Sequence, residues 1–549
     1  MYGLNYTYNI FFGEFSDLTD IQKKVIPLVL EGKNALVISS TASGKTESVI
    51  APICEILISS SVDIRNTLKV LYIVPTRALV NDLIRRTKIK IEKLGLVIAG
   101  KTGDNQSFNI KKPQNILFTT PESLDSLLCK YPKLLEKLKF LIIDELHFFD
   151  NTYRGDQLRV LIQRLKDNST ESFSIYCMSA TINKPQEIMN RYIDVGEICI
   201  SKGSRNIIYL PIDSSKFDNY WIKFKKYAEK NFSYPQKFLV FSNSKKDVIN
   251  TVNELKKTYS EDLERILEHH ASLSTTERKK VEAILKEEKF AICVSTSTME
   301  LGIDIGDISA VILKKPPLTT SSLLQRIGRA NRRNKKNICF GIYDNEDDKE
   351  LFKKMIEDAK NGIVEDYQYA PDLSVCVQQI LSLSYQNYKN PSFRLTEEKI
   401  LLLLEPLKFK DEVIRDVLEN LIFNKQLITK INSQGKILIF PDTKLLNKIE
   451  ENNWNTVIHS NIPPNRDLPV YDEHQKMIGT ISPPDKLGTF NLAAKKWKIQ
   501  KIAEKKIFVK QITESSNIPN FQNSINGFFT FYLPEKYQHH IDSRELLKI

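Results

Sequence analysis

The segment Ala35–Thr46, with the sequence ALVISSTASGKT, joins a short apolar run to a loop that ends in Gly-Lys-Thr. The apolar run is typical of a buried strand, and the residues after the loop are predicted to form a helix, Lys45–Ser59. The backbone N–H groups that start such a helix point toward a bound phosphate, as in the pattern G-x-x-x-x-G-K-[ST]. Ser39 stands where this pattern has its first glycine, which matters less after an extended strand. We therefore expect a bound nucleotide, with Lys45 on its β- and γ-phosphates and the Thr46 hydroxyl on Mg²⁺.

The composition is that of a folded, soluble protein with several domains. A chain of 549 residues exceeds the size of one hydrophobic core and predicts three or four domains of about 150 residues. The 79 Lys and Arg residues outnumber the 67 Asp and Glu residues, and the net charge of +12 favours a polyanionic partner. The seven cysteines form no C-x-x-C pair, which indicates reduced cysteines in a cytoplasmic protein rather than zinc or iron–sulfur ligands. No apolar run approaches about 18 residues, so we expect no membrane-spanning segment.

Short β-branched runs alternate with helix-like segments over the first 365 residues. This alternation predicts a fold of the α/β class, in which helices cover parallel sheets. In residues 1–200 the predicted strands are 35–39, 70–74, 116–119, 140–143 and 174–178. In residues 201–365 they are 238–241, 291–294 and 310–313. Two successive sheets are therefore expected, with a boundary near residues 201–215.

The pattern changes after residue 365. Residues 395–424 have helical periodicity and residues 435–441 predict a strand, which together indicate a compact helical unit with a β-wing over residues 366–450. Further strands are predicted at 468–471, 476–481, 497–502 and 507–512, so residues 451–549 are expected to form a small β domain. Lysines interleave with Trp497 and Phe508 in this last region. They predict either a surface that stacks bases and binds phosphates, or the solvent face of a barrel whose aromatic residues are core.

A pair of acids, Asp144 and Glu145, directly follows the predicted strand 140–143. The first sheet presents the end of this strand beside the phosphate loop. Asp144 is therefore a candidate ligand of Mg²⁺, and Glu145 is a candidate to orient and deprotonate an attacking water.

The segment Gln325–Arg333 carries four arginines. Arg329 and Arg332 are three residues apart and share one face if the segment is helical. Placed across a cleft from the phosphate loop, they stabilise the charge that develops on a transferred phosphoryl group. A solvated helix face remains the alternative interpretation.

The order and spacing of these motifs resemble the superfamily 2 helicases of the DExH-box class over the whole two-sheet region. The resembling stretches are Leu18–Gln22, Thr41–Thr46, Asp144–His147, Ser179–Thr181, Ser295–Asp304 and Gln325–Arg332. Ala42 stands where many members have glycine, and Asn331 replaces the usual glycine of the last stretch. The resemblance implies two tandem RecA-like domains, residues 1–200 and 201–365, that hydrolyse ATP with Mg²⁺.

The resemblance also implies a role for individual residues. For nucleotide binding these are Gln22, Thr41, Ala42, Ser43, Gly44, Lys45, Thr46, Glu47, Asp144, Gly302 and Asp304. For catalysis they are Lys45, Glu145, Gln325, Arg329 and Arg332, and for coupling hydrolysis to movement they are His147, Ser179 and Thr181. For nucleic-acid binding they are Thr76, Arg77, Gly103, Thr120, Pro121, Ser242, Ser244 and Thr296. Hydroxyl and backbone N–H groups at such positions bind phosphate oxygens without reading bases.

Within the second sheet region and after it, the sequence is similar to the large helicase-related (Lhr) family. The resembling stretches are 300–306, 325–330, 371–381, 461–463, 468–471, 478–481 and 497–499. The resemblance implies a winged-helix domain, residues 366–450, and a β-barrel-like domain, residues 451–549. It implies 3′-to-5′ movement on single-stranded DNA with a duplex junction, in DNA repair or antiviral defence, without an obligatory oligomer and with any partner proteins encoded nearby. An RNA-directed DExH helicase and a nucleic-acid-binding scaffold with a vestigial ATPase remain the alternatives.

Overall fold

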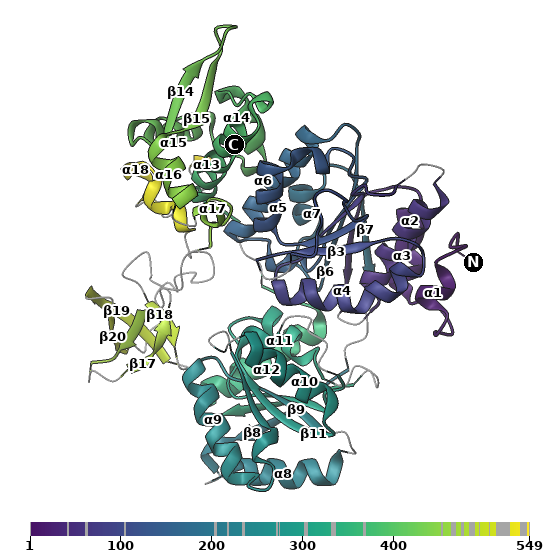
Figure 1. Cartoon of the computed structure of the whole chain (residues 1–549). Coiled ribbons are helices and arrows are strands. Elements are labelled where there is room, and N and C mark those ends of the chain that lie inside the picture. Colours follow the sequence, from purple (N-terminus) through teal and green to yellow (C-terminus); the bar gives the residue numbers. More distant parts are fainter. Residues whose placement is uncertain are drawn as a thin grey trace.

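The first lobe, residues 2–201, is built on a sheet of seven parallel strands (Figure 1). The strand order is β3-β4-β2-β5-β6-β1-β7. The strands are β1 Ala35–Ser39, β2 Val70–Ile73, β3 Ile98–Lys101, β4 Ile116–Thr119, β5 Phe140–Ile143, β6 Ser174–Ser179 and β7 Glu197–Ser201. The computed structural model describes residues 2–40, 43–60, 64–103, 106–201, 206–216, 219–232, 236–270, 273, 275–300, 306–330, 336–365, 369–451, 454–462, 468–473, 477–481, 489–492, 495–503, 506–511, 527–538 and 546–547.

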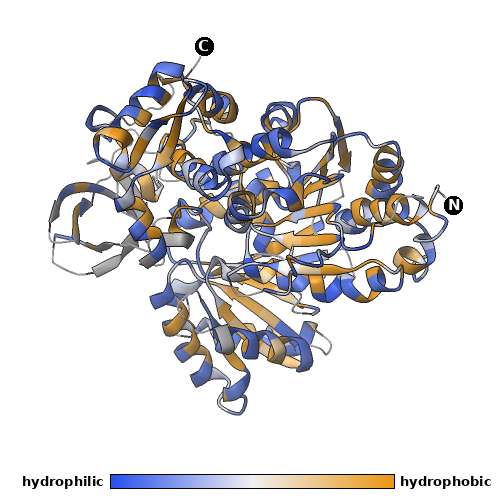
Figure 2. Ribbon diagram, turned by 45° about the horizontal axis from the view of Figure 1, so that its top comes forward, coloured by the Kyte–Doolittle hydropathy of each residue, from blue (hydrophilic) through white to orange (hydrophobic). Residues whose placement is uncertain are grey.

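Helices cover both faces of this sheet. Along β1, Ala35 and Val37 pack in one hydrophobic cluster with α2, α3 and α4, whereas Leu36 packs in a second cluster with α5, α6 and α7. The helices are α1 Tyr8–Phe12, α2 Asp20–Leu30, α3 Lys45–Ser59, α4 Arg77–Glu92, α5 Pro121–Lys130, α6 Tyr153–Asn168 and α7 Pro185–Tyr192. Strands that are buried on both faces are apolar throughout, which is why they stand out in the sequence. Figure 2 shows hydrophobic strands between helices whose outer sides are hydrophilic.

The second lobe, residues 206–365, repeats this architecture with six parallel strands in the order β10-β11-β9-β12-β13-β8. The strands are β8 Asn206–Asp213, β9 Gln236–Phe241, β10 Ile266–His269, β11 Phe290–Ser295, β12 Ala310–Leu313 and β13 Lys336–Tyr343. The helices are α8 Tyr220–Asn231, α9 Lys245–Thr258, α10 Thr275–Glu287, α11 Thr320–Ile327 and α12 Glu346–Asn361. The prediction of two successive α/β sheets is confirmed, and the chain passes from one sheet to the other between Ser201 and Asn206.

A helical unit, residues 369–462 and 527–547, follows the two lobes. Its elements are α13 Ser374–Lys389, α14 Glu397–Leu404, α15 Asp411–Phe423, the antiparallel pair β14 Leu427–Ile431 and β15 Ile437–Pro441, α16 Thr443–Glu451, α17 Trp454–Val457, the 3-10 helix η8 Phe528–Tyr532 and α18 Glu535–Gln538. Phe529 and Leu533 belong to the same hydrophobic cluster as α13, and Phe409 pairs with Leu547. The last described residues therefore pack on the helical unit, although the sequence groups them with the β domain. Its identity as a winged-helix domain stays a prediction.

Between α17 and η8 the chain forms a separate five-stranded sheet. The strands are β16 Leu468–Tyr471, β17 Met477–Ile481, β18 Thr489–Leu492, β19 Lys495–Ala503 and β20 Lys506–Gln511. Their order is β17-β16-β20-β19-β18, with β16 and β20 parallel and the other pairs antiparallel. Within the described ranges this is an open row of strands, so the closure of a barrel stays a prediction.

All seven cysteines are free and buried, as the scattered spacing predicts. Four of them lie in strands, and Cys54, Cys129 and Cys376 lie in helices α3, α5 and α13. Over the residues that the structure describes, no helix combines the length and the apolar character that crossing a membrane requires.

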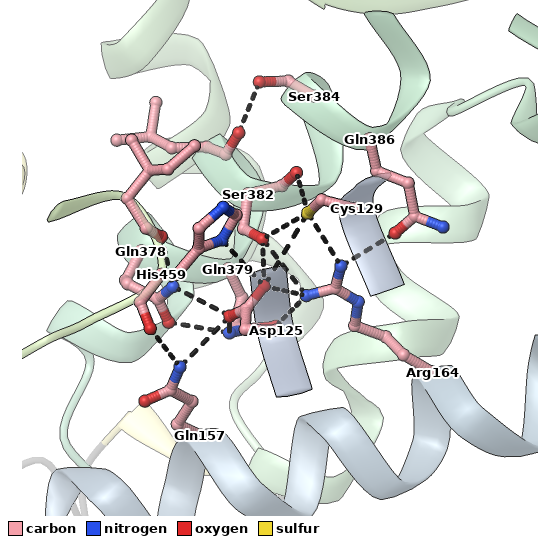
Figure 3. A network of polar contacts seen from close by, with 12 residues as sticks. Asp125, Cys129, Gln157, Arg164, Gln378, Gln379, Ser382, Ser384, Gln386 and His459 are labelled. Carbon is pink, nitrogen blue, oxygen red and sulfur yellow. Dashed lines mark hydrogen bonds and ion pairs between the residues drawn. The ribbon is translucent and has the colours of Figure 1, made fainter. Parts of the chain in front are cut away.

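Helix α13 of the helical unit packs directly on α5 and α6 of the first lobe. Asp125 of α5 is fully buried at this junction and accepts hydrogen bonds from Arg164 Nη1 at 2.9 Å and His459 Nδ1 at 3.3 Å (Figure 3). Burial alone would raise the pKa of Asp125, but Arg164 and the hydrogen-bond donors hold it well below its usual range. Burial likewise opposes protonation of His459, yet negative charge on Cys129 and Asp125 outweighs it and raises the pKa of His459 to about 9. The junction therefore holds a buried carboxylate between two cations at neutral pH.

Asp125, Cys129 and His459 also have ligand-type atoms within 4.8 Å of one another. Arg164 donates to Asp125 at 2.9 Å and to the Cys129 sulfur at 3.4 Å. A guanidinium thus already lies where a metal cation would bind, and we interpret this group as a structural ion cluster.

The protonated His459 makes the stability of this junction depend on pH. Because its folded pKa of about 9 exceeds the ordinary 6.5, its contribution is complete below pH 6.5 and is lost as the pH rises through 9. That difference corresponds to at most about 3 kcal/mol. We expect the midpoint temperature of unfolding, measured by circular dichroism, to decrease as the pH is raised from 7 to 10. In the His459→Gln protein this decrease is expected to be smaller. Parallel pH profiles for the two proteins would contradict this assignment.

Candidate nucleotide and nucleic-acid sites

The phosphate loop connects the end of β1 to the start of α3, which begins at Lys45 as predicted. Gly44 caps this helix with a φ of +83°, and a Cβ there would lie 2.2 Å from Gln22 Nε2. Only glycine fits both constraints. The Lys45 ammonium donates to the carbonyl oxygens of Ser39 at 2.5 Å and Ser40 at 3.0 Å, so it lies over the loop. Thr41 and Ala42 lie outside the described residues.

The N-cap and the first turn of α2 hold this loop from the side. Thr19 donates its hydroxyl to the Ser43 carbonyl oxygen at 2.9 Å, and Gln22 donates to the Gly44 carbonyl oxygen at 3.4 Å. The Ser43 hydroxyl is buried and lacks a hydrogen-bond partner within the described part of the chain. Glu47 lies in the first turn of α3, where it is half-buried. Gln22 thus lies at the loop, and its contact with adenine stays a prediction.

The acid pair lies at the same edge of the sheet, at the end of β5. Asp144 is buried, accepts a hydrogen bond from the Tyr72 hydroxyl at 2.7 Å and accepts another from the Glu145 N–H at 2.8 Å. Burial and the neighbouring Glu145 carboxylate raise the pKa of Asp144 to about 6, and the charge of Lys45 opposes that rise. Glu145 has a φ of +52°, a conformation that non-glycine residues adopt mainly where the surroundings enforce it.

This geometry fits Mg²⁺. The ion prefers oxygen ligands, and the site offers the Asp144 carboxylate and the Thr46 hydroxyl. The pKa of the Asp144 carboxyl is raised by burial and by the adjacent Glu145 carboxylate, and a bound cation would stabilise its charged form. Asp144 and Thr46 are therefore the residues that would hold the ion. Tyr72 is a contributor that the sequence does not single out, because a tyrosine within an apolar strand is usually core.

His147 links the acid pair to the segment after β6. Its Nδ1 lies 3.1 Å from the Ser179 hydroxyl and accepts a hydrogen bond from the Ala180 N–H at 3.4 Å. Burial lowers the pKa of His147 to about 3, so the ring is neutral and carries its proton on Nε2. The structure therefore joins His147 and Ser179, two of the predicted coupling residues, and Thr181 follows two residues after Ser179.

The predicted nucleic-acid-binding residues of the first lobe follow three neighbouring strands. Thr76 comes after β2, Gly103 after β3 and Thr120 after β4, and these strands are adjacent in the order β3-β4-β2. Thr76 and Thr120 are the N-cap residues of α4 and α5, so Arg77 and Pro121 begin those helices. Arg77 packs directly against Gly103, where a Cβ would lie 2.7 Å from the guanidinium.

Arg154 of α6 joins these loops, although nothing in its local sequence signals a role. Its guanidinium donates to both oxygens of Glu122, at 2.7 and 3.2 Å, and to the Pro75 carbonyl oxygen at 2.8 Å. Glu122 lies in the first turn of α5, and Pro75 directly precedes Thr76. Arg154 therefore fixes the distance between the two segments that carry Thr76 and Thr120.

In the second lobe, Ser242 and Thr296 follow the neighbouring strands β9 and β11. The Ser242 hydroxyl is buried and, within the described ranges, has no hydrogen-bond partner. Ser244 uses its side chain to cap α9 at the Asp247 N–H, 3.1 Å away. The structure thus gives Ser244 a local helix-capping role that the sequence interpretation did not include.

The arginine-rich segment differs from its expected helical geometry. Helix α11 contains Gln325 and ends at Ile327, so Arg329 lies in the turn beyond it and the argument from a shared helical face is wrong for this residue. Arg329 is buried and donates to the Glu300 carbonyl oxygen at 2.5 Å. Arg326 pairs with the Glu300 carboxylate at 2.7 Å and donates to Asn243 at 3.2 Å, so it joins three motif segments. Arg332, Gly302 and Asp304 lie outside the described residues.

Family models match both lobes. The DEAD/DEAH box helicase family matches residues 19–188, and the helicase conserved C-terminal domain matches residues 223–334. The first lobe is therefore similar to the DEAD/DEAH box helicases, and the second lobe is similar to the C-terminal domain of helicases. These matches support an ATP-hydrolysing helicase whose two lobes have the RecA-like fold.

A curated relative is similar to this chain in sequence, and two solved structures are similar to it in fold. The ATP-dependent helicase Lhr-Core of Methanocaldococcus jannaschii is 30% identical over 455 residues, which cover 77% of this chain and 53% of the relative. This chain thus spans about half the length of that curated relative. The structure of Mycobacterium smegmatis helicase Lhr bound to ssDNA and AMP-PNP matches with a TM-score of 0.71 at 21% identity, covering 83% of this chain and 62% of the other. A DUF1998 helicase, MrfA, bound to DNA and AMPPNP matches with a TM-score of 0.64 at 19% identity, covering 93% and 73%.

Lys45 and Glu145 provide the first test of the nucleotide site. Lys45→Ala removes the charge beside the phosphate loop, and Glu145→Gln removes the candidate base without changing its shape. We expect each variant to lose ATP turnover by about 10²- to 10³-fold, while Glu145→Gln still binds ATP. Steady-state phosphate release and nucleotide binding measure the two effects. Lys33→Ala, an exposed lysine of the same lobe, is the control. Normal turnover in either site variant would refute the assignment.

Tyr72 provides a second test, directed at the residues that would hold Mg²⁺. Tyr72→Phe removes the hydrogen bond to Asp144, and we expect nucleotide affinity in Mg²⁺ to fall by about fivefold. Affinity in EDTA is expected to stay unchanged, as measured with a fluorescent nucleotide. Tyr176→Phe is the matched control, because this buried tyrosine stacks on Phe140 at the opposite end of β5. Equal losses with and without Mg²⁺ would contradict a positioning role for Tyr72.

Proposed function

We propose that this chain is an ATP-dependent helicase or translocase that moves 3′ to 5′ along single-stranded DNA. One observation carries the proposal: the nucleotide-site residues and the nucleic-acid-binding residues share one edge of the first sheet. The former follow β1 and β5, and the latter follow β2, β3 and β4. In this arrangement, a change at the nucleotide phosphates has to cross only a few β-strands to reach the nucleic-acid contacts.

The chemistry we propose for the first lobe is phosphoryl transfer from ATP to water. Lys45 neutralises charge on the β- and γ-phosphates, and Glu145 orients the water and accepts its proton. Asp144 and Thr46 are the residues that would hold Mg²⁺, which would supply positive charge to the phosphates. The buried Tyr72 hydroxyl keeps the Asp144 carboxylate in one orientation.

The second lobe contributes the remaining charge. In our proposal Arg329, Arg332 and Gln325 meet the γ-phosphate when the lobes close, and Gly302 and Asp304 line the nucleotide. Ser242 and Thr296 then hold one part of the strand while Thr76 and Thr120 hold another. When the lobes open after hydrolysis, the distance between these two sets of contacts changes, and the protein moves along the strand. Because the contacts are to phosphates, this movement does not depend on the bases.

The accessory parts are proposed to hold the strand as it leaves the motor. We interpret the helical unit as a winged-helix domain and the five-stranded sheet as a barrel-like module. Along β19, Trp497 and Ile499 are buried, whereas Lys498 is exposed and lies opposite the exposed Lys510 of β20. Trp497 is therefore core, which is the plainer of its two sequence interpretations. Like charges opposite one another destabilise a sheet, so a basic face of this kind favours a phosphate-binding role.

The proposed cellular setting follows from the resemblance to the Lhr family. We place the protein in the cytoplasm, acting without an obligatory oligomer in DNA repair or antiviral defence, with any partners encoded by neighbouring genes. Inspection of those genes tests this part.

The strand type is tested by ATP hydrolysis with matched oligonucleotides. We expect single-stranded DNA to raise turnover by at least about tenfold, because strand contacts stabilise the closed pair of lobes. RNA of the same sequence is expected to stimulate less. Stimulation by RNA alone would support an RNA-directed helicase, and no stimulation by either strand would support a scaffold.

Polarity is tested with tailed duplexes. We expect DNA with a 3′ single-stranded tail to be unwound and DNA with only a 5′ tail to stay paired, as measured by strand-displacement fluorescence. The Glu145→Gln protein is the negative control. Unwinding that depends on a 5′ tail would overturn the proposed direction.

A further inference from the structure

The buried Asp125 lies on the same short helix as two of the proposed strand-binding residues. Helix α5 spans only Pro121–Lys130, with Thr120 as its N-cap. Glu122, in its first turn, pairs with Arg154, and Asp125 lies three residues further on. Residues three apart lie on one face of a helix, and both carboxylates bind side chains of α6, Glu122 to Arg154 and Asp125 to Arg164. Any rotation or shift of α5 that moves Thr120 also moves Asp125.

Three side chains of α13 fix Asp125 from the helical unit. Gln379 donates to Asp125 Oδ2 at 2.7 Å, Gln378 donates to the same oxygen at 3.1 Å, and the Ser382 hydroxyl donates to Oδ1. Figure 3 shows these groups converging on the carboxylate. Gln378 also donates to the Ile458 carbonyl oxygen at 2.5 Å, so the turn after α17 is joined as well.

Helix α6 completes the connection. Gln157 donates to Asp125 Oδ2 at 3.1 Å and to the His459 carbonyl oxygen at 2.9 Å. Arg164 donates to Asp125, to Gln379 at 2.9 Å and to Gln386 at 2.7 Å. The same helix carries Arg154, which holds the loops before α4 and α5. One helix therefore ties the strand-binding loops at one end to the helical unit at the other.

We propose that Asp125 is a positioning residue for strand binding, because it locks α5 to α13 so that the first lobe and the helical unit move as one rigid body while the second lobe opens and closes. This inference rests on the proposed function, since it concerns how the predicted grip of Thr120 and Pro121 is held. It assigns the helical unit to the stationary side of the motor.

The energetics of burial support a lock rather than a hinge. Separating α5 from α13 would remove the protonated His459 and the α13 donors from Asp125, while the Asp125–Arg164 pair within the first lobe would stay together. Opening a buried ion cluster in this way is unfavourable, because Asp125 and His459 lose each other's charge in a place that water does not reach. The described junction is also apolar around the cluster: Cys129 of α5 and Val160 of α6 belong to the hydrophobic core of the helical unit.

The first test weakens the lock from the side of the helical unit. Gln379→Leu removes the shortest amide donor to Asp125, at a position 254 residues from it in sequence. We expect the concentration of single-stranded DNA that gives half-maximal ATPase stimulation to rise about tenfold. The KM for ATP without DNA is expected to stay unchanged. A purely structural role would lower the amount of active protein, and hence the maximal rate, without moving the half-saturating concentration.

Controls make this test decisive. Lys399→Ala removes the half-exposed ion pair with Asp167 at the same junction and should leave half-saturation unchanged. Asp125→Asn is the stronger variant, and where it fails to fold Gln379→Leu decides alone. An unchanged half-saturating concentration in a folded Gln379→Leu protein would overturn the proposal. Absence of DNA stimulation in the unmodified protein would instead refute the proposed function, and is seen before any variant is measured.

The second test asks whether the lock stays closed during turnover. Cys129 Sγ lies 3.1 Å from the Ser382 hydroxyl oxygen, so Ser382→Cys brings two sulfurs close enough to bond under a mild thiol oxidant. We expect the oxidised variant to keep the DNA-stimulated turnover of the same reduced preparation, because the linked helices do not separate. Loss of stimulation on oxidation, reversed by dithiothreitol, would show that α5 and α13 move apart and would overturn the proposal.

Discussion

In a parallel sheet every strand ends at the same edge, and this constraint assembles the functional residues. The phosphate loop after β1, the acids after β5 and the loops after β2, β3 and β4 are spread over about a hundred residues of sequence. Each is polar because it leaves the buried sheet at that edge, and each begins a helix or a turn whose N–H groups point outward. The order of the β-strands then determines which loops are neighbours. The nucleotide loops and the nucleic-acid-binding loops therefore lie side by side although they are far apart in the sequence.

The second lobe obeys the same constraint, but buried ion pairs fix its arginines. Glu300 receives Arg326 through its carboxylate and Arg329 through its backbone oxygen, so a single residue sets the position of both. Arg326 and Arg329 have the same chemistry and lie three residues apart, yet Arg326 also binds Asn243 and covers the ring of Phe241. Arg326 is therefore a structural member of the motif, and the difference comes from partners supplied by distant strands.

Local pattern was sufficient to predict the central strands and the phosphate-loop helix. β1, β4, β5 and β12 have the predicted bounds, and α3 begins and ends as expected, because strands buried on both faces are continuously apolar. Strands with an exposed face or unusual residues were missed: β7 lies at an edge, β8 contains Pro211, and β13 contains Gly341 packed against Tyr209. Asp125, Arg154 and Tyr72 could not be identified, since the partners that define their roles lie 32 to 334 residues away and no local periodicity records such pairing.

The buried charges where α5 and α6 meet α13 bear on whether this junction opens during the cycle. A joint that opens in each cycle must tolerate water, so polar groups there are best left exposed or paired weakly. A joint that must stay closed can bury charges, provided that every donor and acceptor finds a partner, because water then has no route to replace them. Both carboxylate oxygens of Asp125 satisfy this condition, with six donors from α6, α13 and the turn after α17, whereas Gln157 Oε1, Arg164 Nε and His459 Nε2 are buried without a hydrogen-bond partner among the described residues. Such a cluster adds little net stability compared with apolar packing, but it admits only one relative position of the helices. A motor that moves one lobe relative to a fixed set of nucleic-acid contacts requires that single position.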